Sequence, residues 1–137
     1  MSGCIHVSLL IMLVIMAMND PFVNARPKVH VHVVNMLSGK YILNIHCYWK
    51  DDDLGQHKLP VNGHLDWSFR ASIFGDTVFN CDMEWAHGHG VFRVYWQDVE
   101  LQGMCHTTNC IWLAANDGLY LKDFRINKFV LMYQWLI

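Results

Sequence analysis

The sequence predicts an all-β fold, an antiparallel β-sandwich of about seven or eight strands that is held by two disulfides. Three observations support this prediction. Apolar and polar residues alternate with a period of two in several short segments, turn-forming residues separate these segments, and four cysteines follow residue 25. Short strands at regular spacing with turns between them are typical of antiparallel sandwiches and barrels. The length of 137 residues fits one such domain.

An unbroken apolar run, SLLIMLVIMAM, lies near the start of the chain at residues 8–18. It is shorter than the roughly 20 residues that span a bilayer, and it has the length of the apolar part of a secretory signal peptide. We therefore expect residues 1–25 to be a signal peptide that is cleaved after Ala25, and residues 26–137 to form a secreted, extracellular domain. An uncleaved membrane anchor and a buried core helix are the alternatives.

The alternating segments of the expected domain define its strands. Aromatic and β-branched residues occupy every second position of each segment, as in half-buried strands. The segments are residues 29–33, 41–50, 64–70, 78–85 and 92–97, with a shorter one at 119–121. The apolar stretch 124–137 is ambiguous, and we interpret it as a final strand followed by a tail that covers a sheet edge.

Turn signals separate these segments. Ser38-Gly39 predicts a hairpin between the first two strands, and residues 60–63 precede the third. Residues 74–76 and 87–90 separate the next pairs, and residues 116–118 precede the short segment at 119–121.

The cysteine count supports two disulfides. Cys4 falls in the expected signal peptide, which leaves Cys47, Cys81, Cys105 and Cys110. An even number of cysteines in a short secreted domain is typical of a disulfide framework, and four cysteines allow three pairings. Cys47 and Cys81 both occupy the apolar phase of their strands, which favours their pairing. Cys105 and Cys110 are close enough in sequence for a local bond across a turn.

Histidines and aspartates raise the possibility of a metal site. His30 and His32 share one strand face, and His87 and His89 flank a glycine, but no third ligand can be placed beside either pair. The run Asp51-Asp52-Asp53 lacks the spaced oxygen ligands of a calcium loop and is typical of a solvated loop. No cofactor or metal is therefore expected.

The sequence assembles no catalytic site. It contains no G-x-S-x-G motif and no glycine-rich phosphate loop, and the expected disulfides would use every cysteine of the mature chain. Glycosidase-type carboxylate pairs are not excluded, but nothing selects a pair. The formal charge of −2 argues against nucleic-acid binding, which needs a basic patch. We expect a monomer that is not an enzyme and does not remain in a membrane once processed.

The order of motifs resembles the plant self-incompatibility S1 family, also called S-protein homologues. The resemblance covers about residues 29–121. It depends on a combination of segments that would be weak singly: His46-Cys47, then Asp51-Asp52-Asp53-Leu54-Gly55-Gln56-His57-Lys58-Leu59, then Cys105 to Cys110, Trp112 and Asp117-Gly118. Tyr48-Trp49 and Asn80 depart from the usual pattern beside the first two cysteines.

The resemblance implies a secreted plant protein with a β-sandwich fold and two disulfides. Founding members of the family are ligands from the stigma that a pollen receptor reads to reject self pollen, and the resemblance implies no catalytic residues. We therefore expect an extracellular signalling ligand that binds a cell-surface receptor protein through its loops. The loops are residues 51–59, 74–77, 87–90 and 98–104, and the candidate receptor-facing residues are Asp51, Asp52, Asp53, His57, Asp76, His87 and His89.

Two other functions remain open from the sequence. Tryptophans that converge on an exposed groove would indicate a carbohydrate-binding protein or a hydrolase, although the strand phases of Trp49, Trp67, Trp85, Trp96 and Trp112 favour core positions. The apolar residues 129–137 would suit a membrane-active effector.

Overall fold

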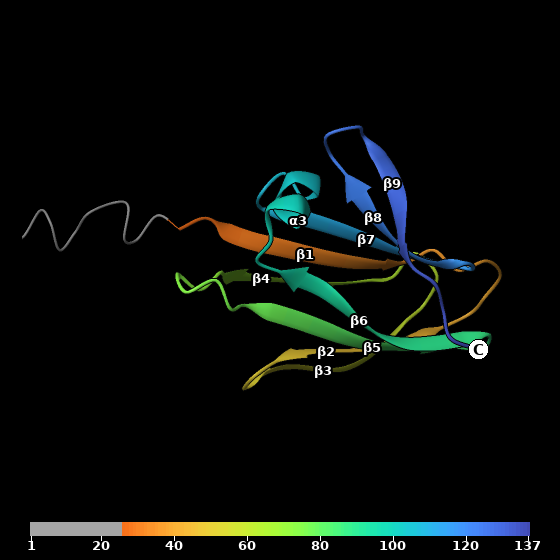
Figure 1. Ribbon diagram of the computed structural model, residues 1–137. Helices are drawn as coiled ribbons and strands as arrows, with labels where there is room; N and C mark the ends of the chain where they lie inside the picture. The colour runs from red at the N-terminus through yellow and green to blue at the C-terminus, as the bar shows by residue number, and fades with distance from the viewer. Residues whose placement is uncertain (1–25) are drawn as a thin grey trace, which may run out of the picture.

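The computed structural model describes residues 26–137 (Figure 1). The elements are β1 (Lys28–Asn35), β2 (Leu43–Trp49), β3 (Asp52–Leu59), β4 (His64–Arg70), β5 (Val78–Trp85), β6 (Gly88–Trp96), α3 (Val99–Met104), β7 (Asn109–Ala115), β8 (Gly118–Asp123) and β9 (Lys128–Tyr133). The signal peptide expected at residues 1–25 lies outside the described residues. Within residues 26–137 no helix is long and apolar enough to cross a membrane.

The strands form two sheets. One has the strand order β4-β1-β7-β8-β9, and the other, which we call the four-stranded sheet, has the order β3-β2-β5-β6 and lies below the first in the view of Figure 1. Neighbouring strands are antiparallel except β1 and β7, which run parallel. The prediction of an all-β sandwich with two disulfides is confirmed, with nine strands in the described residues.

The core lies between the sheets and follows directly from the alternation in sequence. Val31 and Val33 of β1 are fully buried, as is Trp112 of β7, and they come from the five-stranded sheet. Phe79 and Val94 are their fully buried counterparts in the four-stranded sheet. Because side chains alternate across a strand, one face of each sheet is left for solvent.

Both disulfides join the pairs that the sequence favoured. Cys47 and Cys81 lie directly opposite each other on the adjacent strands β2 and β5 and are separated by 34 residues in sequence. Cys105 and Cys110 close a bond over a sequence separation of 5 residues, between the end of α3 and the start of β7. The first bond therefore crosslinks distant parts of the four-stranded sheet, whereas the second fixes one local connection.

The hairpin predicted at Ser38-Gly39 is wrong. Strands β1 and β2 belong to different sheets, so residues 36–42 cross between them. The buried Asn35 holds this crossover, because its side-chain amide donates to the carbonyl oxygens of Tyr41 and Leu59, each at 2.9 Å. Its side-chain oxygen accepts from the Leu37 N–H at 2.9 Å, so a buried polar side chain satisfies backbone groups that a hairpin ladder would otherwise pair.

The loop expected at residues 51–59 is instead mostly the strand β3, which forms one edge of the four-stranded sheet. Its turn from β2 lies at Lys50-Asp51, and Leu59 alone of its residues is buried. An edge strand with polar residues on both faces carries no apolar alternation, so the sequence pattern resembled a solvated loop.

The segment expected as an exposed loop at 98–104 contains the short helix α3. Asp98 caps its N-terminus, because the carboxylate accepts from the Leu101 N–H. Leu101 and Met104 are buried beneath the helix. One turn and a half is too short for a helical period to stand out in the sequence.

The expected turn at 87–90 is confined to Ala86-His87, and β6 begins at Gly88. Gly88 and Gly90 leave room for aromatic side chains: a Cβ on Gly88 would lie 2.6 Å from Cβ of Trp135, and one on Gly90 would lie 2.1 Å from Cζ of Phe92. His89 and Leu136 exchange backbone hydrogen bonds at 2.9 and 2.8 Å. The C-terminal tail thus covers an edge of the four-stranded sheet, as the sequence predicted.

Candidate binding face on the four-stranded sheet

The outer face of the four-stranded sheet carries polar side chains because the inner face takes the apolar ones. On β5, Cys81 and Met83 are buried, whereas Asp82 and Glu84 are exposed. On β2, Ile45 is buried and the flanking Asn44 points outward. The two faces therefore follow from the same period-two pattern.

Strand register aligns these outward residues in rows across the sheet. The first row reads Lys58, Asn44, Glu84 and His89, and the second reads Gln56, His46, Asp82 and Val91. A third row reads Asp53, Tyr48, Asn80 and Arg93. Directly opposite side chains on neighbouring strands lie about 5 Å apart, so each row is a line of interacting groups.

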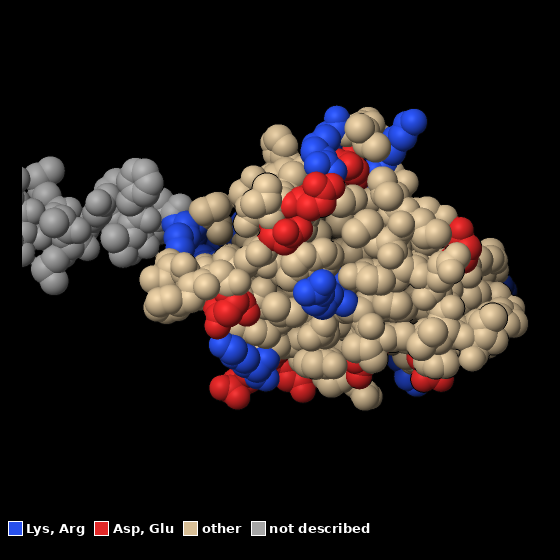
Figure 2. Space-filling view, viewed as in Figure 1, with Lys and Arg blue, Asp and Glu red and all other residues tan. Residues whose placement is uncertain are grey.

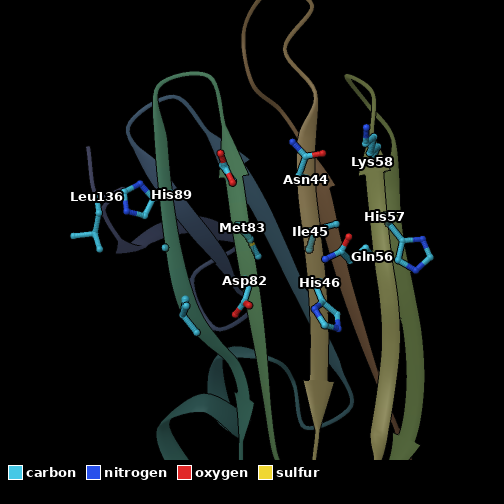
Figure 3. Close-up of a pocket in the computed structure, with 13 residues that line it drawn as sticks. Asn44, Ile45, His46, Gln56, His57, Lys58, Asp82, Met83, His89 and Leu136 are labelled. Atoms are coloured by element: carbon cyan, nitrogen blue, oxygen red, sulfur yellow. The ribbon is translucent and has the colours of Figure 1, made fainter.

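The first two rows line an open groove of about 960 Å³ (Figure 3). Ile45 and Met83 contribute to its lining between the rows, and Leu136 of the C-terminal tail borders it beside His89. We call this surface the sheet groove and define it by its lining: Asn44, Ile45, His46, Gln56, His57, Lys58, Asp82, Met83, Glu84, His89, Gly90, Val91 and Leu136.

Hydrogen bonds hold part of this face in place. His46 Nε2 lies 2.6 Å from Oδ1 of Asp53, and the Asp53 carboxylate also accepts from the Gly55 N–H at 2.8 Å. These two contacts, the Gly55 backbone first, lower the pKa of Asp53 below its usual value. Tyr48 donates to Asp82 over 3.2 Å. Desolvation and the neighbouring carboxylate raise the pKa of Tyr48, so this phenol stays neutral.

The structure separates the candidate residues that the sequence proposed. Asp51 lies in the turn between β2 and β3, with Asp52 and Asp53 next to it at the start of β3, and Asp76 is tied to this turn by Lys50 Nζ at 3.1 Å. We call these four aspartates with Lys50 the aspartate turn. His57 and His89 line opposite sides of the sheet groove.

His87 does not line the sheet groove, but it lines a smaller pocket together with Glu84 and His89. Tyr41 Oη lies 2.9 Å from its Nε2, and its ring packs edge-on against Trp85. Its position beside two aromatic side chains suits a structural role at the turn between β5 and β6.

The sequence interpretation missed the acidic centre of the groove, Asp82 and Glu84. Their outward phase was visible in the alternation of residues 78–85. The separate alternation of residues 41–50 placed Asn44 and His46 on the outer phase of their own strand. The signal that could have found the groove was therefore the polar phase of two strands, read together with the pairing that the disulfide between Cys47 and Cys81 imposes.

The groove contains histidine and carboxylate groups but no activated nucleophile. His46 and Asp53 form a pair like the orienting half of a catalytic triad, yet the hydroxyl nearest to them in the rows belongs to Tyr48, whose pKa is raised. All four cysteines of residues 26–137 are in disulfides. The arrangement offers charge and hydrogen bonds for binding.

The other histidines form a smaller cluster on the five-stranded sheet. His30 and His32 stack with ring centroids 6.4 Å apart, and His32 Nδ1 lies 2.6 Å from Oδ1 of Asp66. His64 contacts the second oxygen of Asp66. Across the part of the chain that the structure describes, no three His, Cys, Asp or Glu residues are grouped so as to hold a metal ion.

The tryptophans pack into the sandwich. Trp112 is fully buried, Trp85 is 7% exposed, and the other four are partly buried against the core. The sequence expectation that these side chains belong mostly to the core is therefore confirmed, and none of the six forms part of the lining of the sheet groove.

Charged residues of both signs are interspersed on the face shown in Figure 2. Arg93 lies over the ring of Trp96 at 4.6 Å, and Arg125 pairs with Asp123 and Glu100 at 3.0 Å each. The pairing with Arg125 lowers the pKa of Asp123. Most charges are thus engaged within the molecule.

Comparison with known proteins decides the family. A family model described as "Plant self-incompatibility protein S1" matches residues 30–135. The chain belongs to the plant self-incompatibility S1 family. It is 40% identical to S-protein homolog 1 of Arabidopsis thaliana over 77% of this chain and 70% of that protein. It is 33% identical to the Self-incompatibility protein S1 of Papaver rhoeas over 71% of this chain and 70% of that protein.

A solved structure supports the fold of this S1-family chain. The SPH (Self-Incompatibility Protein Homologue) structure, from what is described as a widespread family of small, highly stable, secreted proteins from plants, matches with a TM-score of 0.58 and 18% identity. The match covers 80% of this chain and 96% of the solved one. The solved structure thus shares the fold of this chain, and the family resemblance inferred from the motifs is confirmed.

Proposed function

We propose that this S1-family protein is an extracellular signalling ligand that a plant cell-surface receptor protein reads through the sheet groove. The observation that carries the proposal is the groove itself, where side chains from all four strands of one sheet form rows of charged and polar groups. A rigid scaffold that presents such groups favours specific recognition, because little ordering is needed on binding.

The scaffold is well suited to this task. The disulfide between Cys47 and Cys81 joins β2 and β5, the two central strands that carry Asn44, His46, Asp82 and Glu84. The backbone beneath the groove is therefore constrained both by hydrogen bonds on each side and by a covalent bond. We further propose that residues 1–25 are removed as a signal peptide before the domain reaches the cell exterior.

An enzymatic role has weaker support. Within residues 26–137 the hydroxyl nearest to the His46–Asp53 pair in the strand rows is that of Tyr48, whose pKa is raised, and the groove is open. We therefore propose a binding function without catalysis and without a cofactor.

The two other functions also lose support. A sugar-stacking platform needs exposed tryptophan faces, whereas all six tryptophans pack against the core. The apolar tail is engaged within the fold: Tyr133 donates to the Arg93 carbonyl at 2.9 Å, and Trp135 donates to the Ala115 carbonyl at 2.7 Å. We propose that the tail is part of the scaffold and that the mature protein does not insert into membranes.

A membrane-vesicle experiment tests this function. The full chain is expressed in a plant secretory system, and the secreted product is sequenced at its N-terminus, where we expect Arg26. Saturable binding to plant plasma-membrane vesicles is then measured. We expect binding that disappears when the vesicles are treated with protease and that is absent from liposomes of the extracted lipids. Equal binding to the lipid liposomes, or no saturable binding to vesicles from any plant tissue, would contradict a receptor-protein ligand.

A further inference from the structure

The sheet groove contains a carboxylate that the domain leaves without a partner. Glu84 lies on β5, which pairs with β2 on one side and β6 on the other, and its exposed side chain lies between Asn44 and His89 in the row. Within residues 26–137 the Glu84 side chain forms no hydrogen bond or ion pair with another residue. Apart from Asp51 and Asp52, every other acidic side chain of that range has such a contact.

A second carboxylate lies next to Glu84 on the same face. Asp82 is two residues away on β5, so the two carboxylates are about 7 Å apart along the strand. In the part of the chain that the structure describes, its carboxylate has one hydrogen bond, which Tyr48 donates over 3.2 Å. The pair therefore has unused acceptor capacity in the middle of the sheet.

Apolar surface borders the two carboxylates. Val91, directly opposite Asp82 on β6, is 64% exposed, and Leu136 at the sheet edge is 61% exposed. Such surface suits the aliphatic part of a long cationic side chain, which packs against apolar groups while its charged end reaches an acceptor.

We propose that the sheet groove binds an arginine-bearing segment of the receptor protein, with the guanidinium on Glu84 and Asp82 and its methylene chain against Val91. This inference rests on the proposed function and names the chemistry of the partner. Arginine fits better than lysine because its planar fork can donate to both carboxylates at once. Lys58 and Arg93, at the margins of the rows, disfavour a partner with a continuous basic surface and thus favour a single arginine.

Charge complementarity is the argument for this occupant. The side chains of Asp51 and Asp52 in the aspartate turn are exposed at the tip of a hairpin, where a salt bridge contributes little. Glu84 instead lies in the interior of a strand that is paired on both sides, so its backbone is already ordered before a partner binds. This difference supplies a matched control, because two charges can be removed from either place.

The probe is the peptide acetyl-Gly-Ser-Arg-Ser-Gly-amide, and its control carries citrulline, which keeps the shape of arginine without its charge. Titration of the isotopically labelled secreted protein is followed by NMR. We expect shift changes on β2, β5 and β6 and an affinity about tenfold or more above that of the citrulline peptide. The double variant Asp82→Asn/Glu84→Gln should lose this difference, whereas Asp51→Asn/Asp52→Asn should keep it.

Equal affinity for the two peptides, or equal loss in both double variants, would overturn the arginine assignment. The vesicle experiment separates this failure from failure of the proposed function. If vesicles bind the wild type and Asp82→Asn/Glu84→Gln equally, the inference is wrong while the receptor-ligand function stands. If no variant binds vesicles, the function itself is wrong, whatever the peptide result.

Discussion

The sheet groove and the aspartate turn are both acidic, but the structure treats their charges differently. In the aspartate turn, Asp53 is held by His46 and Gly55, and Asp76 by Lys50. In the sheet groove, the Glu84 side chain has no partner among residues 26–137, although the backbone around it is fixed on both sides. By the number of acidic residues alone, the aspartate turn would be the stronger candidate for binding a cation, since it contains four aspartates.

The difference between the two regions shows why placement matters more than charge count. A solvated carboxylate in a turn gains little from a partner cation, because water already satisfies it and the pair must order both side chains. A carboxylate on a rigid strand loses less conformational entropy on binding, because its backbone is already ordered. This is why we propose that recognition uses the sheet groove.

Removal of the disulfide beneath the groove should have the largest effect. The chain-entropy relation gives about 4 kcal/mol for the bond between Cys47 and Cys81, which closes 34 residues, and about 2 kcal/mol for the bond between Cys105 and Cys110, which closes 5. Urea unfolding of Cys47→Ala/Cys81→Ala and Cys105→Ala/Cys110→Ala tests this order. A larger loss in the second variant would contradict it.

The second largest effect on stability should come from adding a side chain at Gly90, beneath the groove. Its new Cβ would meet the ring of Phe92, which is packed against Tyr133 and Trp135 and has little room to move. We expect Gly90→Ala to lower the free energy of unfolding by about 1–3 kcal/mol. Gly103→Ala, where the neighbour is the flexible end of Arg125, is the control and should cost nothing. Equal stability of the two variants would show that Phe92 can move aside.

Replacing an apolar border of the groove should have a smaller effect and should act on binding. Val91→Thr keeps the shape of the side chain and, since residue 91 is exposed, should leave the unfolding free energy within about 0.5 kcal/mol of wild type. Arginine-peptide affinity should fall about fourfold, as expected for about 0.8 kcal/mol of lost apolar contact. Unchanged affinity would remove Val91 from the binding surface.

Replacing Asp53 should have the smallest effect, and the pH dependence of that effect on stability should be confined to acid pH. Its pKa is lowered in the folded protein, so its contribution to stability is present above the unfolded pKa of about 3.8 and is lost as the pH falls through the folded value. The stability difference between wild type and Asp53→Asn should therefore shrink below about pH 4 in urea unfolding. A difference that grows there would show that the contacts from Gly55 and His46 do not favour the charged carboxylate.

The sequence predicted the strands that have one apolar and one polar face. It missed the strands whose two faces are similar in polarity. Residues 78–85 became β5 without change, because apolar and polar residues alternate there throughout. Strand β3 has polar residues on both faces, and β7 has half-buried residues such as Ile111 and Leu113 on its second face, so neither shows the alternation.

The groove could be predicted only in part, because its rows join segments far apart in the chain. The local alternation placed Asp82 and Glu84 on the outward face of their strand. The apolar-phase positions of the two cysteines indicated that β2 and β5 are neighbours. The crossover at residues 36–42 and the docking of Trp135 depend on contacts between distant segments, which no local pattern records.

Hydrogen exchange on receptor-bearing membranes tests the central claim most directly. The secreted protein is labelled alone and on plant plasma-membrane vesicles, and the protection of each segment is compared. We predict added protection in β2, β5 and β6 around Asn44, Glu84 and His89, with none at the Lys50-Asp51 turn. Protection confined to that turn and to residues 71–77, with none on the four-stranded sheet, would contradict the assignment of recognition to the sheet groove.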